Sequence, residues 1–155
     1  MSLLERDSLA PNAWLGNLPV TSRYTAGVAG ERFFRAIQNE GKILGTKCDH
    51  CDITYVPGRI FCERCLAELN DWQDVGTVGE VYTFTLLYEN LDGTHRDEPL
   101  VVAFIRIADG GLIHQIGDVD LENLSIGMPV EAVLKPQADR EGSIKDIEYF
   151  RPLSS

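Results

Sequence analysis

CDHCDITYVPGRIFCERC, residues 48–65, contains all four cysteines of the chain. They form two Cys-x2-Cys pairs, Cys48 with Cys51 and Cys62 with Cys65, separated by ten residues. Each pair places two sulfurs within reach of one ion, and four thiolates are a ligand set that suits tetrahedral Zn²⁺. We expect the intervening ITYVPGRIF to form a short β-ribbon that brings the two pairs together. The stretch therefore predicts a zinc ribbon at residues 44–71.

This metal site is expected to be structural rather than catalytic. An ion held by four protein thiolates has no coordination position left for water or substrate. Zinc is the expected ion, and iron in a rubredoxin-like tetrathiolate is the alternative. His50 lies inside the first pair and could replace one sulfur, but we expect it to point outwards because four thiolates are present. A thioredoxin-type pair should follow a strand and open a helix, and neither pair does so.

Composition sets the outer limits of the fold. The chain has 155 residues and 44% hydrophobic residues, which is ordinary for a globular protein with one core and a small metal-stapled module. No apolar run is long enough to span a membrane. The opening MSLLERDSLAPNAWLG lacks the apolar core of a signal peptide, so we expect a cytoplasmic protein. In that reducing compartment, metal binding is expected of the cysteines rather than disulfide formation.

The charge is unevenly spread along the chain. The formal net charge is −10. Residues 1–65 hold eight Lys/Arg and seven Asp/Glu, whereas residues 66–155 hold six against seventeen. Nucleic-acid binding depends on cations that neutralise phosphates, so the acidic C-terminal half is poorly suited to it.

Upstream of the cysteines, the sequence predicts an arm and a helix. Residues 1–29 contain Pro, Gly and Asn with scattered apolar side chains and show no periodicity, which indicates an extended arm. The following segment, 30–43, places Phe33, Phe34 and Ile37 on one side of a helical wheel. We expect an amphipathic helix from about Glu31 to Glu40, with Gly41 as its C-terminal cap.

Downstream, residues 72–155 have the pattern of β-structure. Five segments rich in β-branched and aromatic residues, with turn residues at their edges, predict five strands. These segments are residues 76–90, 98–111, 111–119, 128–136 and 142–152. The second and third form an expected hairpin with a Gly-Gly turn at residues 110–111. Five strands in so short a stretch, without a helix long enough to cover a flat sheet, predict a five-stranded OB-fold barrel. The expected fold class is mostly β.

The sequence offers no self-sufficient active site, and we assign no catalytic residue. The metal is expected to use every cysteine, so none is left as a nucleophile. His95 follows Gly93 and Thr94 in an expected loop, and His114 lies within an expected strand, where a structural role is commoner than a catalytic one. There is no nucleophile elbow, P-loop or Gly-rich dinucleotide turn.

The order of these features resembles that of acyl-CoA-associated zinc-ribbon/OB-fold proteins, a family long catalogued as a domain of unknown function. The resemblance covers residues 24–153. It is carried by GERFFRAIQNEGKILGTKC at 30–48, the two cysteine pairs, VPGR at 56–59, Trp72, GEVYTFT at 79–85 and IEYFRP at 147–152. The chain departs from the family at Asp52, where Gly is frequent, and at Gly58, where Pro-Pro-Arg is frequent. Asp can adopt the left-handed turn that Gly would supply there.

The resemblance implies a non-catalytic accessory subunit. Such proteins bind or shield acyl-CoA and help to assemble thiolase-like or other acyl-CoA enzymes, so a hetero-oligomer with such a partner is implied. The partner supplies the catalytic residues. CoA or acyl-CoA is then the expected ligand, beside a structural zinc ion.

The less acidic half of the chain is where we expect the CoA phosphates, or an acidic partner surface, to bind. Arg59 is the first choice, since the ribbon should hold it rigidly. The remaining candidates are Lys47, Arg64, Arg35, Lys42 and Tyr55. The alternative for each cation is that it is an ordinary solvated surface residue.

A second functional class stays open at this point. OB-folds and zinc ribbons are both common in nucleic-acid binding, and an OB-fold binds single strands through a basic groove with stacking aromatic residues. Tyr82, Phe84 and Tyr88 could provide the stacking, but Glu80 and Glu89 lie beside them instead of lysines. The charge balance therefore favours the accessory-subunit hypothesis over the nucleic-acid hypothesis.

Overall fold

The helix expected before the first cysteine pair is present as α1 (Gly27–Glu40), in a computed structural model that describes residues 25–153. It begins four residues earlier than expected, at Gly27, with Ala26 as its N-cap residue. Gly41 ends the helix as predicted, in the left-handed conformation (φ 69°), and its N–H donates to Ile37 O at 3.1 Å. Most of the predicted arm lies outside the described residues.

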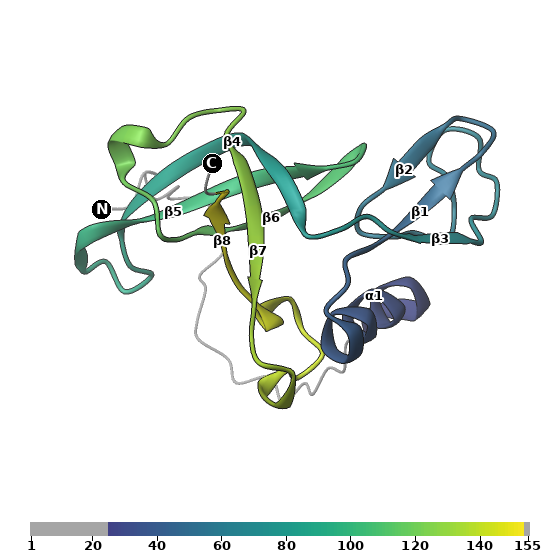
Figure 1. Ribbon diagram of the computed structural model, residues 1–155, viewed down its shortest axis with the longest axis horizontal. Helices are drawn as coiled ribbons and strands as arrows, with labels where there is room; N and C mark the ends of the chain where they lie inside the picture. Colours follow the sequence, from purple (N-terminus) through teal and green to yellow (C-terminus); the bar gives the residue numbers. More distant parts are fainter. Residues whose placement is uncertain (1–24, 154–155) are drawn as a thin grey trace, which may run out of the picture.

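The helix lies below the cysteine-bearing sheet and beside the loop that joins the last two barrel strands (Figure 1). Phe33 and Ile37 are fully buried and pack into the main hydrophobic core, and Phe34 packs against it. The C-terminus of the helix is tied to the loop that joins the last two barrel strands. There the Arg140 guanidinium donates to Ile37 O at 3.2 Å, and Gln38 donates to Arg140 O at 3.1 Å. A basic side chain on the last carbonyls also suits the helix dipole.

The first β-rich part is a three-stranded antiparallel sheet that carries the cysteines. Its strands are β1 (Leu44–Cys48), β2 (Ile53–Tyr55) and β3 (Asp71–Asp74), in the order β2-β1-β3. The expected ribbon within residues 53–61 is thus limited to ITY, which pairs with β1. Strand β3 adds a third strand that the sequence did not reveal, with Trp72 opposite Thr46. The Arg32 guanidinium lies 4.5 Å above the Trp72 ring and links the helix to this sheet.

The second part is the predicted five-stranded closed barrel. Its strands are β4 (Val78–Glu89), β5 (His95–Ile107), β6 (Gly110–Ile116), β7 (Pro129–Leu134) and β8 (Ile147–Pro152), in the order β4-β5-β6-β8-β7. Short 3₁₀ turns occur at η1 (Leu121–Asn123), η2 (Gln137–Asp139) and η3 (Ile144–Asp146). Alternate residues of β5, among them Val101, Ala103 and Ile105, point inwards and are buried. The barrel is weakly closed between β6 and β8, where only Ile116 and Phe150 pair.

The turn between β5 and β6 differs from the prediction. Ile107 pairs with Gly110, so the turn residues are Ala108 and Asp109, and the two glycines belong to β6. Ala108 has φ 50°, a left-handed value that glycine would adopt more easily. The glycines are needed in the strand instead, because the ribbon approaches it closely at Gly110. The Gly-Gly pair therefore marks a contact between the two parts rather than a turn.

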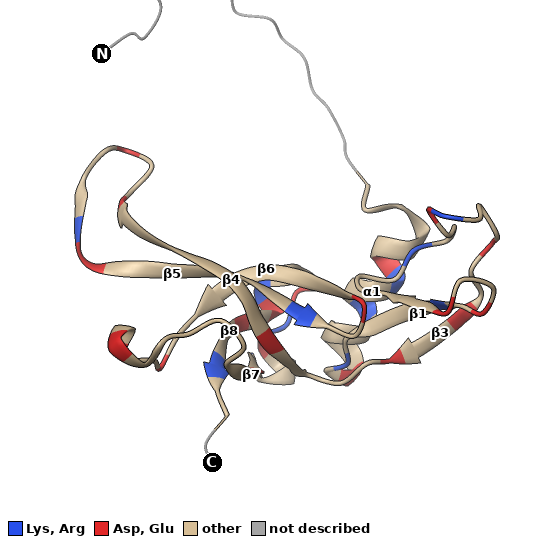
Figure 2. Ribbon diagram, turned by 90° about the horizontal axis from the view of Figure 1, so that it is seen from above, with Lys and Arg blue, Asp and Glu red and all other residues tan. Residues whose placement is uncertain are grey.

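Strands β4 and β5 continue past the barrel as a projecting hairpin (Figure 2). Its tip is closed by Asn90 N donating to Thr94 O at 2.8 Å and by Asp92, whose carboxylate accepts from Thr94. Within residues 25–153, α1 is neither long enough nor apolar enough to cross a bilayer.

Candidate metal centre and ribbon–barrel cleft

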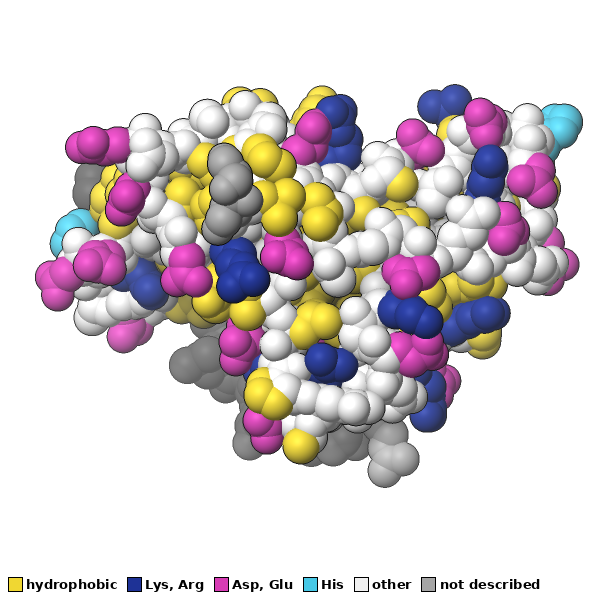
Figure 3. Space-filling model, viewed as in Figure 1, with side chains coloured by type: hydrophobic (Ala, Val, Ile, Leu, Met, Phe, Trp, Pro, Cys, Tyr) yellow, Lys and Arg dark blue, Asp and Glu magenta, His cyan; other side chains and the backbone are white. Residues whose placement is uncertain are grey.

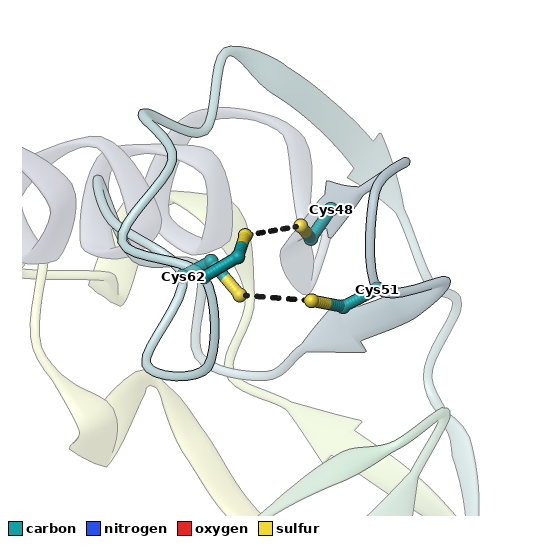
Figure 4. A group of neighbouring side chains, drawn as sticks. Cys48, Cys51 and Cys62 are labelled. Carbon is teal, nitrogen blue, oxygen red and sulfur yellow. Dashed lines mark hydrogen bonds between the residues drawn. The ribbon is translucent and has the colours of Figure 1, made fainter.

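The four cysteines predicted as metal ligands come together in the ribbon (Figure 4). Cys48 lies at the end of β1 and Cys51 in the turn that follows. Cys62 and Cys65 lie in a loop closed by the bridge between residues 61 and 68. The Sγ atoms of Cys48 and Cys65 are 3.6 Å apart, those of Cys51 and Cys62 are 3.8 Å apart, and all four lie within 4.8 Å of one another.

These separations fit a tetrahedral tetrathiolate. Zn–S bonds of about 2.3 Å in tetrahedral geometry put two sulfurs about 3.8 Å apart. Cys48 and Cys62 are buried and Cys51 and Cys65 are half-buried, so bulk water has little access to the centre. His50 is exposed and is not part of the cluster, as expected. The donor set and its geometry therefore support structural zinc at this site.

Tyr55 adds a hydrogen bond to the metal site that the sequence did not indicate. Its hydroxyl lies 3.2 Å from Cys62 Sγ, where it can donate to a thiolate. This contact lowers the pKa of the Cys62 thiol to about 6 and raises the pKa of Tyr55 to about 12. The Tyr55 hydroxyl thus stabilises the Cys62 thiolate and supports this metal ligand from outside the coordination shell.

Both departures from the family pattern fit the structure. Asp52 adopts a left-handed conformation, with φ 51°, so it replaces Gly in the turn as predicted. A Cβ atom built on Gly58 would lie 2.4 Å from the ring of Trp72. Gly58 therefore lets the ribbon backbone lie directly on that ring, in the tip that precedes Arg59.

A hollow of about 620 Å³ separates the ribbon from the β5–β6 turn, and we name it the ribbon–barrel cleft. Figure 3 shows it as the notch between the two parts, with Lys and Arg side chains on both walls. Its lining includes Tyr55, Arg59, Glu63, Arg64, Arg106, Asp109 and Gly110. Three guanidinium groups thus face two carboxylates, in a chain whose net charge is −10.

Arg59 is held in the cleft from several sides. Its backbone N–H donates to Thr46 Oγ1 at 2.8 Å, and Thr46 is completely buried in the ribbon. Its guanidinium donates to Glu63 at 2.6 Å and lies 5.0 Å above the ring of Tyr55. The ribbon backbone therefore places Arg59 at the cleft, with its side chain about half exposed.

The other two arginines enter the cleft from opposite walls. Arg64 lies between Cys62 and Cys65 and has no carboxylate within ion-pair distance among the described residues. Arg106, on β5, pairs with Glu80 and lies 5.3 Å above the ring of Tyr82. Arg106 was not among the residues predicted to bind CoA or a partner. Only the pairing of β5 with β6 at a tight turn brings it towards the ribbon, and that contact spans some 50 residues of sequence.

Three of the candidate cations lie elsewhere. Arg35 forms an ion pair with Glu31 along the helix at 2.7 Å and lines a separate hollow beside α1. Lys42 pairs with Glu40 at 2.7 Å, and Lys47 pairs with Asp52 at 3.2 Å. The structure thus groups Arg59, Arg64 and Tyr55 in one cleft and leaves these three cations on other surfaces.

The remaining histidines lie away from the cleft. His95 is exposed on the projecting hairpin and stacks on Tyr88, with ring centroids 6.4 Å apart. His114 lies in the barrel wall opposite Ala103 and makes an edge contact with the Phe150 ring at 5.8 Å. Its Nε2 is 3.4 Å from Ile144 O.

Two family models match consecutive parts of the chain. Residues 36–70 match the rubredoxin-like zinc ribbon domain of ChsH2, and residues 72–135 match the ChsH2 C-terminal OB-fold domain. The boundary between the two matches falls within β3, where the ribbon sheet ends and the chain enters the barrel.

Two curated relatives are archaeal. A DUF35 domain-containing scaffold protein of Methanocaldococcus jannaschii is 28% identical over 130 residues, which cover 80% of this chain and 91% of the relative. A protein of the same name from Methanothermobacter thermautotrophicus is 28% identical over 127 residues, covering 78% of this chain and 94% of the relative.

Solved structures show the same fold. A DUF35-family protein of unknown function from Sulfolobus solfataricus superposes with a TM-score of 0.61 at 25% identity, covering 81% of this chain and 84% of that one. The Ltp2-ChsH2(DUF35) aldolase gives a TM-score of 0.58 at 20% identity, covering 84% and 98%. Residues 36–135 thus contain both domains of the ChsH2 family, the rubredoxin-like zinc ribbon and the C-terminal OB-fold, and the chain is similar to the DUF35 scaffold proteins.

Proposed function

We propose that this protein is a non-catalytic accessory subunit of an acyl-CoA enzyme complex, and that it binds the phosphates of CoA or acyl-CoA in the ribbon–barrel cleft. The observation that carries the proposal is the cleft itself. Its walls place three guanidinium groups around one hollow, in a chain that is otherwise strongly acidic.

The accessory role is supported by the chemistry of the metal centre and by the relatives. A tetrathiolate zinc ion has no open coordination position for a substrate, so its role is to stabilise the fold of the ribbon. Two relatives carry the name scaffold protein, and a solved structure of this fold is named for Ltp2 and ChsH2 together as an aldolase. The partner proposed here is a thiolase-like enzyme or another enzyme of acyl-CoA metabolism, which supplies the catalytic residues.

The cleft is better suited to a ligand with several phosphate groups than to a ligand with a single carboxylate. Guanidinium groups bind phosphate oxygens through two parallel N–H donors, and CoA carries both a pyrophosphate and a 3′-phosphate. Among the described residues, Arg64 forms no ion pair with a carboxylate. It can therefore bind a phosphate without first giving up such a partner. Arg59 and Arg106 would exchange Glu63 and Glu80 for phosphate oxygens while their aromatic contacts keep them in place.

Calorimetric titration of the zinc-loaded protein with CoA tests this assignment. Arg64→Ala and Arg106→Ala should each weaken CoA binding, by roughly tenfold for the loss of a charge-assisted hydrogen bond. Arg151→Ala is the matched control, because Arg151 is an exposed arginine paired with Glu131 on the barrel, away from the cleft. Dephospho-CoA should bind more weakly than CoA to the wild-type protein. Equal CoA affinity in all three variants would overturn the cleft assignment.

A further inference from the structure

The barrel wall of the ribbon–barrel cleft carries an exposed tyrosine. Arg106 lines the cleft, and its guanidinium lies 5.3 Å above the ring of Tyr82 on the neighbouring strand β4. Tyr82 is 53% exposed. On the ribbon wall, Arg59 lies over Tyr55 in the same way, but Tyr55 is only 6% exposed. Of these two rings beside arginines of the cleft, that of Tyr82 is therefore the one that a bound molecule can reach.

A β-bulge places Tyr82 on this surface. Val81 pairs with Ile105, and the next pair along the two strands is Thr83 with Phe104. Tyr82 is thus an extra residue of β4 that has no opposite residue on β5. Bulges interrupt the alternation of a strand and redirect side chains, often beside functional sites. Here the bulge allows the Tyr82 ring to lie under an arginine of the cleft.

Phe104 extends this aromatic surface towards β6. Its ring makes an edge contact with that of Tyr82, with centroids 5.9 Å apart. It also lies against Gly111, where an added Cβ atom would be 2.7 Å from Phe104 Cζ, so the glycine leaves room for the ring. We name the surface formed by Tyr82, Phe104 and Gly111 the aromatic shelf. Gly111 pairs with Arg106, so the shelf adjoins the barrel wall of the cleft.

The aromatic shelf is suited to a flat, uncharged ring. Its rim is charged, because Glu80 pairs with Arg106 beside Tyr82. An aliphatic chain would gain only burial at such a place. A heteroaromatic ring can stack on the exposed tyrosine and still present polar atoms at its edge to the charged rim.

The covalent structure of CoA brings such a ring within reach. Its adenine is joined through one ribose to both the 3′-phosphate and the pyrophosphate. When Arg106 binds either of these phosphates, the adenine must lie one sugar away from the guanidinium. Tyr82 is the exposed aromatic ring beside that guanidinium.

The three aromatic residues considered above for stacking a nucleic-acid strand do not form a row. Phe84 packs against the main hydrophobic core, and Tyr88 stacks on His95 in the projecting hairpin. Of the three, Tyr82 alone adjoins the cleft. One stacking ring beside the arginines fits a single nucleotide better than a strand.

We infer that the aromatic shelf binds the adenine ring of CoA or acyl-CoA, which stacks on Tyr82 while the phosphates lie in the ribbon–barrel cleft. The inference rests on the proposed function and deepens it, because it assigns the nucleotide end of the ligand to the barrel wall. The pantetheine arm leaves from the other end of the pyrophosphate, away from the shelf. It is then free to carry the acyl group to a catalytic site in the partner enzyme.

Calorimetric titration of the zinc-loaded, full-length protein with three probes tests the inference. The probes are CoA, adenosine 3′,5′-bisphosphate, which keeps the adenine and the 3′-phosphate, and inorganic pyrophosphate, which has no ring. Tyr82→Leu should weaken the binding of CoA and of the bisphosphate roughly tenfold, the effect expected when a base loses its aromatic stacking partner. Pyrophosphate affinity should stay unchanged. Tyr82→Phe keeps the ring and should bind all three probes as the wild type does.

Tyr88→Leu is the matched control, since Tyr88 is a tyrosine of the same strand that is 48% exposed but lies on the projecting hairpin. Its affinities should equal those of the wild type. Wild-type CoA affinity in Tyr82→Leu would overturn the inference. An equal loss for CoA and pyrophosphate would also overturn it, because Tyr82 would then act only by positioning Arg106. A loss for CoA without a loss for the bisphosphate would do so too, because it would place the pantetheine arm on the shelf.

The same titrations separate this inference from the proposed function. CoA binding that is weakened in Arg106→Ala but unchanged in Tyr82→Leu would keep the cleft and overturn the shelf. Binding of the bisphosphate that depends on Tyr82, without binding of CoA, would keep the shelf as an adenine site and overturn the CoA assignment.

Discussion

Gly110, the first residue of β6, lies directly against the backbone of Val56 in the ribbon. A Cβ atom at Gly110 would lie 2.4 Å from Val56 N and 2.5 Å from Val56 O. The next residue, Gly111, donates its N–H to Val56 O at 3.0 Å. Asp109 also accepts from Thr54 N at 2.9 Å. These contacts join ribbon to barrel and set the width of the ribbon–barrel cleft.

Gly110→Ala should therefore change the width of the cleft while leaving every charged residue of its lining in place. The added methyl group has to push the ribbon backbone away, which should destabilise the protein by about 1–3 kcal/mol. CoA binding should weaken as Arg59 moves relative to Arg106. Urea unfolding and CoA titration measure the two effects. Gly93→Ala is the control, since it strains a left-handed turn but meets no atom within 4 Å. Wild-type CoA affinity in Gly110→Ala would show that the cleft does not depend on this contact.

The zinc assignment predicts opposite results for two residues of the same stretch. Cys62→Ser removes a buried ligand, so the bound metal should fall from roughly one zinc per chain to none, and the ribbon should unfold. His50→Ala should keep the zinc, because His50 is exposed and lies outside the sulfur cluster. Elemental analysis of the purified proteins measures both. Loss of metal in His50→Ala, or full zinc content in Cys62→Ser, would contradict the assignment of the ligands.

Tyr55→Phe should weaken zinc binding while leaving the four ligands in place. The variant loses the hydroxyl that lies 3.2 Å from Cys62 Sγ, and such outer contacts typically contribute tenfold or somewhat more to metal affinity. Competition with a chromophoric chelator gives the affinity. Tyr82→Phe, which changes an exposed tyrosine of the barrel, is the control. The idea fails if the two variants bind zinc equally well.

Asp146 should make the stability of the barrel depend on pH. Burial would raise the pKa of this fully buried carboxyl, but its oxygens accept from the N–H groups of Glu141, Gly142 and Ser143, and its pKa is lowered overall. A carboxylate with a depressed pKa contributes stability that is present above the pKa of the unfolded chain, about 4, and lost as the pH falls through the folded value.

Asp146→Asn should accordingly cost about 2 kcal/mol of unfolding free energy at pH 7, and this difference should shrink at pH 2–3. Denaturant unfolding at both pH values measures it. Asp139→Asn changes an exposed aspartate of the same loop and should have little effect at either pH. A penalty for Asp146→Asn that stays constant from pH 7 to pH 2 would contradict the role of the charge.

The parts that were predicted correctly have strong local signals. The helix was readable because Phe33 and Ile37 follow a helical period and Gly41 ends it. The spacing of the cysteines was sufficient for the ribbon, and the β-branched segments with turn residues between them were sufficient for the barrel. In each case the information lies within a short window of sequence.

The features that were missed depend on contacts between distant segments. Strand β3, DWQD, has polar ends and no apolar alternation, so it forms only because β1 offers a partner. The Gly-Gly pair was assigned to a turn, although the approach of Val56 is what requires it. Arg106 resembles any outward-facing residue of a strand until the ribbon is placed beside it. Local patterns cannot show such contacts, because the partner lies about 24–54 residues away.

Identification of the partner in native cells tests the accessory role most directly. The tagged full-length protein is purified at low salt and its bound proteins are identified and quantified by mass spectrometry, with the Cys62→Ser variant as a control for loss of the ribbon. The account predicts stoichiometric recovery of a thiolase-like or related acyl-CoA enzyme subunit with the wild-type protein, and much less with the variant. Stoichiometric recovery of a helicase or polymerase instead, with no acyl-CoA enzyme, would contradict it.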